Sequence, residues 1–430
     1  MVSPYLNRAL QIISDWWWII IPFILFKPAQ FLYLWWRQEV FASQQKSVLL
    51  ELKMPREVLR PIKAMEQVFA GWWPLYDPPD WYEKWIEGKY LLSMSIETVS
   101  DGGNIHFYLR VPATAKNFIE SNIFAQYPEV EISEAEDYTK LVPLDDIPNE
   151  EWDIWGCDFE LTKPDVYPIK TYSQFFEPTD ASKEEKRIDP LASLLEGMSK
   201  LHPGEHMWVQ MRVKPVTTLQ NDYVGRAKDV TSVLLKRKPA VPPTKPLLVK
   251  EAFDTVLFGP LASPAEKAQE IIPAEMRLSP GERDVVAAIE NKASKIMFEC
   301  YIRFIFIGKK GAFYKPNLKN VLSFFANFNT ENLNGIKAYG KTITKIHKHE
   351  RYFTNMLFHD SLLYLSKRRI IRQYLARDYY FYPIDEKKFV FNLEELATLF
   401  HFVGRTNVPS PMLERVDSKK SEPPSNLPVM

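Results

Sequence analysis

The sequence predicts an α+β protein in which an N-terminal transmembrane helix precedes tandem ferredoxin-like (βαββαβ) domains. Two observations predict this fold class: a run of aromatic and aliphatic residues near the N-terminus, and two successive stretches with the element order β-α-β-β-α-β. The chain has 430 residues, enough for two or three domains, and 46% of them are hydrophobic. Its formal net charge is zero, so no overall excess of Lys and Arg indicates a polyanionic partner.

The N-terminal run occupies residues 16–36 and contains the segments WWWIIIPFILF and FLYLWW, with Lys27 as its one charge. A helix of about 20 apolar residues crosses the hydrocarbon core of a bilayer. We therefore predict a membrane anchor at residues 1–45, although Lys27 leaves open a re-entrant hairpin of two short segments. The indole side chains at the two ends of the run resemble the aromatic belts of membrane interfaces; they belong to Trp16, Trp17, Trp18, Trp35 and Trp36.

The charges that flank this run predict its orientation. Arg8 is the one basic residue before it, whereas Arg37, Lys46, Lys53 and Arg56 follow it. The positive-inside rule then places the rest of the chain in the cytoplasm. The sequence therefore predicts a single-pass protein of the inner (cytoplasmic) membrane with its body in the cytoplasm.

The first ferredoxin-like domain is predicted at residues 46–145. Its apolar alternation indicates strands, and apolar residues at helical spacing indicate two helices between them. A turn at 100–104, rich in Gly, Asp and Asn, favours a hairpin between the second and third strands. The predicted strands are 48–54, 90–99, 105–111 and 130–132, and the predicted helices are 61–73 and 113–125.

The second ferredoxin-like domain is predicted at residues 150–345, with an insertion at about 215–295. The insertion contains a proline-rich linker at 236–246 and a capping box formed by Ser279 and Glu282. A helical tail at 346–403 and a flexible linker at 404–430 follow. In this domain the predicted strands are 158–162, 207–213, 297–307 and 335–339, and the predicted helices are 190–201 and 318–328.

One segment, Gly335 to Thr342, matches the phosphate-binding pattern G-x-x-x-x-G-K-[ST]. A working P-loop needs a buried strand directly before it and a helix directly after it. The residues before Gly335 are instead a polar turn, so we interpret the segment as an edge strand and turn. An NTP-using enzyme remains the less favoured alternative.

The remaining residue types indicate no catalytic, cofactor-binding or metal-binding site. Cys157 and Cys300 have no metal-site spacing, and we interpret both as small buried residues in a reducing compartment. Pro203 and Gly204 separate His202 from His206, so this pair does not share a helical face. We therefore predict a protein that is not an enzyme and that has no cofactor.

A basic helix is predicted at residues 362–378. Its cations could contact DNA phosphate or anionic lipid. A solvated face of an amphipathic helix is the alternative that we favour. The cations are Lys367, Arg368, Arg369, Arg372 and Arg377.

Several segments resemble an uncharacterised bacterial family that is typical of Patescibacteria genomes. They include LLELKMPREVLRPIKAMEQVFAG, FYLRVPATAKNFIESNIFAQYPEVEI, DPLASLLEGMSKLHPGEHMWVQ and FNLEELATLFHF. In that family this region stands before, or beside, a DNA-translocating ATPase of the HerA/FtsK and type IV secretion coupling kind. In fused members the ATPase begins just after a linker like the PPSNLP found here.

This resemblance covers nearly the whole chain and implies a role rather than a chemistry. It implies a non-enzymatic, membrane-anchored accessory or scaffold subunit of a conjugation-like translocation system for DNA or protein. The partner would be a separately encoded P-loop ATPase, contacted through sheet edges and the tail from Phe389 onward. Edge strands would also suit lateral assembly into a homo-oligomer. A nucleic-acid-binding module that uses the basic helix is the alternative.

Overall fold

A computed structural model describes residues 4–55, 58, 60–175, 189–235, 278–345, 358–377, 388–403 and 415–416. The linkers predicted at 236–246 and, apart from 415–416, at 404–430 lie outside these residues. So do the side chains at 4–14, 16–20, 23 and 415–416.

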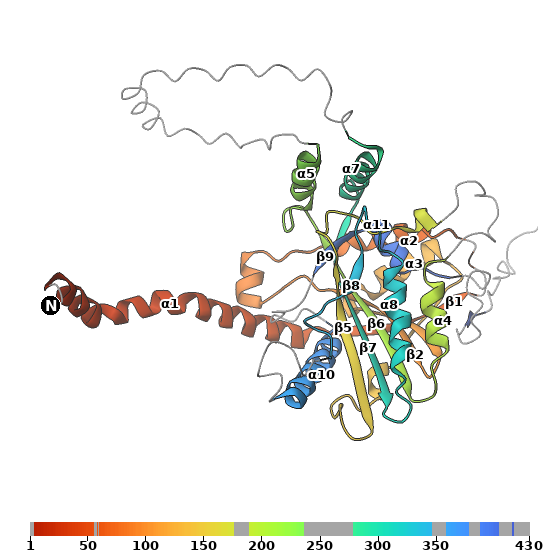
Figure 1. Ribbon diagram of the computed structural model, residues 1–430, viewed down its shortest axis with the longest axis horizontal. Helices are drawn as coiled ribbons and strands as arrows, with labels where there is room; N and C mark the ends of the chain where they lie inside the picture. The colour runs from red at the N-terminus through yellow and green to blue at the C-terminus, as the bar shows by residue number, and fades with distance from the viewer. Residues whose placement is uncertain are drawn as a thin grey trace, which may run out of the picture.

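A single sheet organises the described residues (Figure 1). Its order is β10-β1-β3-β2-β6-β7-β5-β8, with β4 also paired to β1 and β9 also paired to β7. All pairs are antiparallel except the short parallel pair of β1 and β10. The strands are β1 (Ser47–Pro55), β2 (Met94–Asp101), β3 (Asn104–Pro112), β4 (Glu131–Glu134), β5 (Trp152–Leu161), β6 (Glu205–Val216), β7 (Met297–Lys309), β8 (Ile336–Ala338), β9 (Phe389–Asn392) and β10 (Arg415–Val416).

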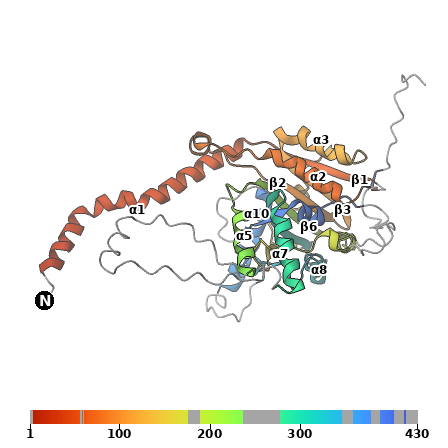
Figure 2. The same cartoon turned by 90° about the horizontal axis from the view of Figure 1, so that it is seen from above.

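Helices cover both faces of this sheet, and one long helix extends away from it (Figures 1 and 2). The long helix is α1, which contacts the body near its C-terminal end and carries the N-terminus far from the sheet. The helices are α1 (Pro4–Gln44), α2 (Lys63–Trp72), α3 (Lys116–Gln126), α4 (Ala192–Ser199), α5 (Tyr223–Leu234), α7 (Pro280–Ala293), α8 (Leu318–Ala326), α10 (His359–Ala376) and α11 (Leu393–Leu399).

The prediction of tandem ferredoxin-like domains is wrong, because the strands of both stretches complete one sheet. Strands β2 and β6 pair from Met94↔Val213 to Asp101↔His206, and this pairing joins the two halves edge to edge. One apolar cluster also takes residues from both halves, including Phe107 of β3 and Phe306 of β7. Sequence periodicity reports which segments are strands, but it does not report whether two distant strands pair.

The predicted transmembrane helix is also wrong. In the part of the chain that the structure describes, no helix combines the length and the apolar character needed to cross a membrane. Although α1 is long, Lys27 lies between Pro22 and Pro28 within it, and Trp and Tyr contribute amphipathic rings rather than purely apolar side chains. The single-pass inner-membrane location predicted from this helix is corrected with it.

The two faces of the sheet differ in what covers them. Helices α2, α3, α4, α8 and α11 pack on one face, which we call the dry face, around the largest apolar cluster. Helix α10 and the segment 138–147 pack on the opposite face, which we call the polar face, around a smaller cluster. In Figure 1, α10 lies on one side of the sheet, with α4 and α8 on the other.

The segment after residue 388 is part of the body, because β9 pairs with β7 and every residue of α11 is buried. Asn392 and Glu395 form a capping box that begins α11 directly after β9. The capping box predicted at Ser279 is confirmed at the start of α7. Since all residues of α11 are buried, this helix offers no free surface to a partner.

Candidate functional site

A row of polar side chains crosses the polar face at the centre of the sheet. Glu97, Gln210, Arg303 and Asp158 stand on β2, β6, β7 and β5, and each is the cross-strand partner of the next. All four are at most 1% exposed. Buried charges need close compensation, so their contacts decide what this row does.

The Glu97 carboxylate has partners on both of its oxygens. Ser95 Oγ and Gln210 Nε2 donate to Oε1 at 2.6 and 3.0 Å, and Tyr138 Oη donates to Oε2 at 2.6 Å. Arg377 Nε lies 2.9 Å from Oε1. A carboxylate with so many partners is not free to act as a base, so we interpret Glu97 as an anchor point for α10.

Arg377 is the residue that α10 inserts into this network. It follows the last residue of the helix with a left-handed φ of 48°, and it donates to Asp137 at 2.5 and 3.0 Å. Burial alone would lower the pKa of Arg377, but Glu97 and Asp137 outweigh burial, and the pKa is raised. Burial raises the pKa values of Tyr138 and Tyr374, so both phenols stay neutral. We call Glu97, Asp137, Tyr138, Tyr374 and Arg377 the clamp.

A second buried ion pair lies next to the clamp. Arg303 Nε donates to Asp158 Oδ1 at 2.7 Å, and both side chains are at most 1% exposed. Arg303 also donates to Gln373 Oε1 of α10 at 3.1 Å and to the Tyr301 hydroxyl. Gln210 of β6, which lies between β2 and β7, donates to the Tyr374 carbonyl oxygen at 3.2 Å. The polar row therefore holds the C-terminal end of α10 from three adjacent strands, β2, β6 and β7.

The other predicted cations of the basic helix also contact the body, except Arg372, which is exposed. Lys367 pairs with Asp153. Arg368 donates to the carbonyl oxygens of Leu144 and Ile147 at 2.9 and 3.0 Å, and Arg369 donates to that of Lys341 at 3.3 Å. The basic pattern thus mainly attaches α10 to its own protein.

The end of α1 and the segment 80–88 form a second candidate surface. A Cβ at Gly88 would lie 2.2 Å from the Arg37 carbonyl oxygen, and Phe41 packs edge-on against Tyr90 at 5.6 Å between ring centroids. Of the predicted anchor residues, Trp35 and Trp36 are 37% and 54% exposed, and the side chains of Trp16, Trp17 and Trp18 lie outside the described residues. We call the exposed residues Leu32, Tyr33, Trp36, Trp81, Tyr82 and Ile86 the aromatic surface.

The segment 335–342 does not have the geometry of a P-loop. Strand β8 lies inside the motif, at the edge of the sheet, rather than before it. The Thr342 hydroxyl, which would bind magnesium in a P-loop, accepts from the Asp158 amide at 3.0 Å and donates to the Tyr339 carbonyl at 3.1 Å. Lys341 is exposed beside it.

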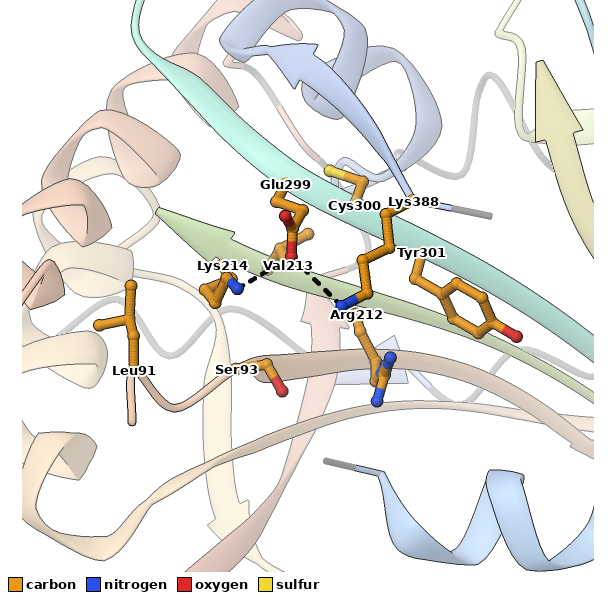
Figure 3. A pocket seen from close by; sticks show the side chains of 9 residues that line it. All are labelled: Leu91, Ser93, Arg212, Val213, Lys214, Glu299, Cys300, Tyr301 and Lys388. Atoms are coloured by element: carbon orange, nitrogen blue, oxygen red, sulfur yellow. Dashed lines mark ion pairs between the residues drawn. The ribbon is translucent and has the colours of Figure 1, made fainter. Parts of the chain in front are cut away.

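A pocket opens on the polar face beyond the end of α10 (Figure 3). Lys214 of β6 and Glu299 of β7 are cross-strand partners with a 2.9 Å ion pair, and Lys388 reaches the same carboxylate at 3.9 Å. Arg212 and Tyr301 are the next pair along the same strands. We call this the cationic pocket.

Sequence reasoning missed the clamp carboxylate and the cationic pocket, although the two strands carried a signal. Gln210, Arg212 and Lys214 alternate with apolar residues in one strand, as Glu299, Tyr301 and Arg303 do in the other. Polar residues at every second position of an otherwise apolar strand indicate one polar face. The sequence analysis predicts both segments as strands but does not assign their polar residues to one face.

Neither cysteine is placed for chemistry. Cys157 and Cys300 are buried and unpaired by a disulfide, as predicted, and burial raises both thiol pKa values. Among the described residues, no three His, Cys, Asp or Glu side chains are grouped to hold a metal ion.

Comparison with known proteins identifies the family of this chain. No curated protein matches the chain. One family profile matches residues 91–401, a range that includes the clamp and the cationic pocket but not α1. Because this match covers more than half of the chain, the chain belongs to the family described as Domain of unknown function (DUF8128).

Proposed function

We propose that this protein is a non-enzymatic assembly subunit that binds a separately encoded P-loop ATPase through its aromatic surface. The observation that carries the proposal is the exposure of large apolar side chains where α1 meets the segment 80–88. Trp81 is 71% exposed, Tyr82 56%, Trp36 54% and Leu32 52%. Exposed apolar groups gathered on one part of a protein mark a site of interaction, and Trp and Tyr are enriched among residues that dominate binding energy.

The identity of the partner comes from the resemblance to proteins in which this region stands before or beside a translocation ATPase. We no longer expect this contact at the tail, because β9 and α11 are built into the body. The aromatic surface lies outside the buried core, and a partner could cover it without unfolding any described element. A conjugation-like translocation system for DNA or protein is the assembly that we propose for this pair.

Co-purification tests this proposal. The full chain is expressed together with the P-loop ATPase encoded nearest to it, and the complex is captured through the ATPase. Replacing Trp36 and Trp81 by Ser should weaken the complex by about 2 kcal/mol or more, roughly 30-fold in the dissociation constant. Tyr314→Ser is the matched control, because Tyr314 is an aromatic residue, 58% exposed, outside the aromatic surface. Absence of any complex, or equal weakening by both changes, contradicts the proposal.

Nucleic-acid binding by helix α10 is the weaker candidate. Phosphate contacts need accessible cations, and each Lys or Arg contact contributes to a strong dependence on salt. Of the predicted cations, Lys367 and Arg377 are in ion pairs within the protein, and Arg368 binds two backbone carbonyls. Salt-dependent DNA binding that is lost in Arg372→Ala would favour this candidate over the assembly role.

A further inference from the structure

We propose that the turn between β7 and α8 binds single-stranded nucleic acid. This segment, residues 309–319, has the sequence KKGAFYKPNLK, with four lysines and no acidic residue. It lies at the end of the sheet where β7 ends and β5 begins (Figure 1). The formal net charge of the whole chain is zero, so the positive charge gathered here is local. We call residues 309–319 the lysine turn.

The charge of the lysine turn is only partly compensated by acidic side chains. Lys309 pairs with Glu151 at 3.1 Å, and this pair is counted as neutral. The other three lysines are exposed, and among the described residues none of them forms an ion pair; they are Lys310, Lys315 and Lys319. If the exposed Glu150 beside Glu151 is also counted, two positive charges remain. The phosphates of a nucleic acid supply the opposite charge at regular intervals.

Buried side chains hold the lysine turn in one conformation. Glu205 is 0% exposed, and it accepts from the Tyr314 amide at 3.1 Å and from the Asn317 side-chain amide at 3.2 Å. Phe313 packs against Phe306 of the dry face, with 4.8 Å between the ring centroids. Because the backbone that carries the lysines is already fixed by these contacts, less conformational entropy is lost when a ligand binds.

Tyr314 favours a single-stranded ligand over a duplex or an acidic protein. Its side chain is 58% exposed, and it stands between Lys310 and Lys315 in the turn. An unpaired base can stack on such a ring while the flanking phosphates contact lysines, whereas the bases of a duplex are already stacked on each other. Lysine acts as a point charge without the planar donor set of arginine. Recognition by this surface therefore depends little on base sequence.

Fluorescence anisotropy of the full chain with a labelled oligothymidine of about 12 nucleotides tests the proposal. Three phosphate contacts that each contribute about −0.7 give a slope of about −2 for log affinity against log salt concentration, measured between about 50 and 200 mM. Replacing Lys310, Lys315 and Lys319 together by Gln should bring this slope close to zero. Tyr314→Ala should weaken binding about fivefold or more, and Tyr314→Phe, which keeps the ring, should not.

A second triple variant controls for the loss of charge alone. Lys63, Lys140 and Lys228 are exposed lysines outside the lysine turn, and replacing all three by Gln removes the same total charge. This control should keep the slope near −2, since its three lysines make no phosphate contact. Arg372→Ala, on the exposed side of α10, should also leave binding unchanged.

Several results would overturn the proposal. They are the absence of salt-dependent binding, an equal loss in the two triple variants, and binding that Arg372→Ala abolishes while the lysine-turn variant retains it. A duplex of the same length that binds as tightly as the single strand would exclude the stacking role of Tyr314. Equal affinity for polyglutamate would assign the surface to an acidic protein instead. The assembly role can fail without affecting these results, because the lysine turn shares no residue with the aromatic surface.

Discussion

The two faces of the sheet solve the same packing problem by different chemistry, and β7 shows both solutions in adjacent residues. Phe304 and Phe306 point into the dry face, where five helices enclose a continuous apolar core. Arg303 and Tyr301 point to the polar face, where one helix is held by ion pairs and hydrogen bonds. Apolar burial is not directional, whereas an ion pair with defined donors and acceptors fixes one arrangement.

This difference suggests that the polar face positions α10 rather than supplying most of the stability. Replacing a buried ion pair by apolar residues is often neutral, but removing one partner leaves an uncompensated charge. The clamp would then hold α10 in a single position on the sheet, and the cationic pocket would stay open beyond the end of this helix. We state this as a hypothesis, which the following experiments can break or sharpen.

The largest effect is expected for Arg377→Ala, which removes the cation that α10 inserts between Glu97 and Asp137. Glu97 would stay buried without its cationic partner, and breaking a buried pair in this way costs about 3–5 kcal/mol. Denaturant unfolding followed by circular dichroism measures the loss. The exposed Arg372 of the same helix is the matched control, and Arg372→Ala should change the free energy of unfolding by less than about 0.5 kcal/mol. Equal effects of the two changes would show that the clamp does not hold α10.

A smaller loss of folding stability is expected at low pH, and its size should differ between the two faces of the sheet. Asp189, beside the dry-face helices, accepts from His401 at 3.1 Å and is 3% exposed, whereas Asp137 of the clamp is 34% exposed. Burial alone would raise both carboxyl pKa values. The interaction with His401 outweighs burial at Asp189, and the interaction with Arg377 outweighs it at Asp137. Both pKa values are therefore lowered. Each carboxylate therefore stabilises the folded state above its unfolded pKa, near 3.8, and this contribution is lost as the pH falls through the lower folded value.

Comparison of Asp189→Asn and Asp137→Asn with the unchanged protein, at pH 7 and again at about pH 3, tests this linkage. At pH 7 Asp189→Asn should destabilise more than Asp137→Asn, whose exposed carboxylate is screened and contributes about 1 kcal/mol or less. Both differences should shrink at about pH 3, because this pH is below the unfolded pKa of the carboxylates, and part of the stability that depends on their charge is then lost. Differences that stay constant with pH would mean that the ion pairs do not control these pKa values.

Much of the strand and helix content could be predicted from the sequence, because it depends on local periodicity. The strands predicted at 48–54, 105–111 and 297–307 lie within β1, β3 and β7. Strand β9 was missed because its four residues, FVFN, run directly into α11 and are too short to show alternation. The single sheet was missed for a different reason, since pairing of β2 with β6 joins residues more than 100 positions apart.

The candidate sites were harder to predict, because both combine residues from distant elements. The basic pattern of α10 is plain in the sequence, yet only the fold shows that Asp153, Asp137 and Glu97 meet its cations. The cationic pocket depends on the register of β6 and β7, which brings Lys214 opposite Glu299. A shift of one residue would turn all these side chains to the other face, so composition alone could not locate them.

The smallest effect is expected for Lys341→Ala, the change that would abolish nucleotide binding in a working P-loop. In such a loop, backbone amides ahead of a helix cradle the phosphates, while Lys and Ser or Thr contact phosphate and magnesium. Here β8 occupies the middle of the motif and the Thr342 hydroxyl already binds two backbone groups of the sheet. We therefore expect no measurable ATP affinity in the unchanged protein and no difference in Lys341→Ala. Equilibrium binding of a fluorescent ATP analogue measures both, and micromolar binding that this single change abolishes would replace the assembly role with an NTP-using one. Binding that Arg212→Lys abolishes and Lys341→Ala leaves intact would instead place the triphosphate in the cationic pocket.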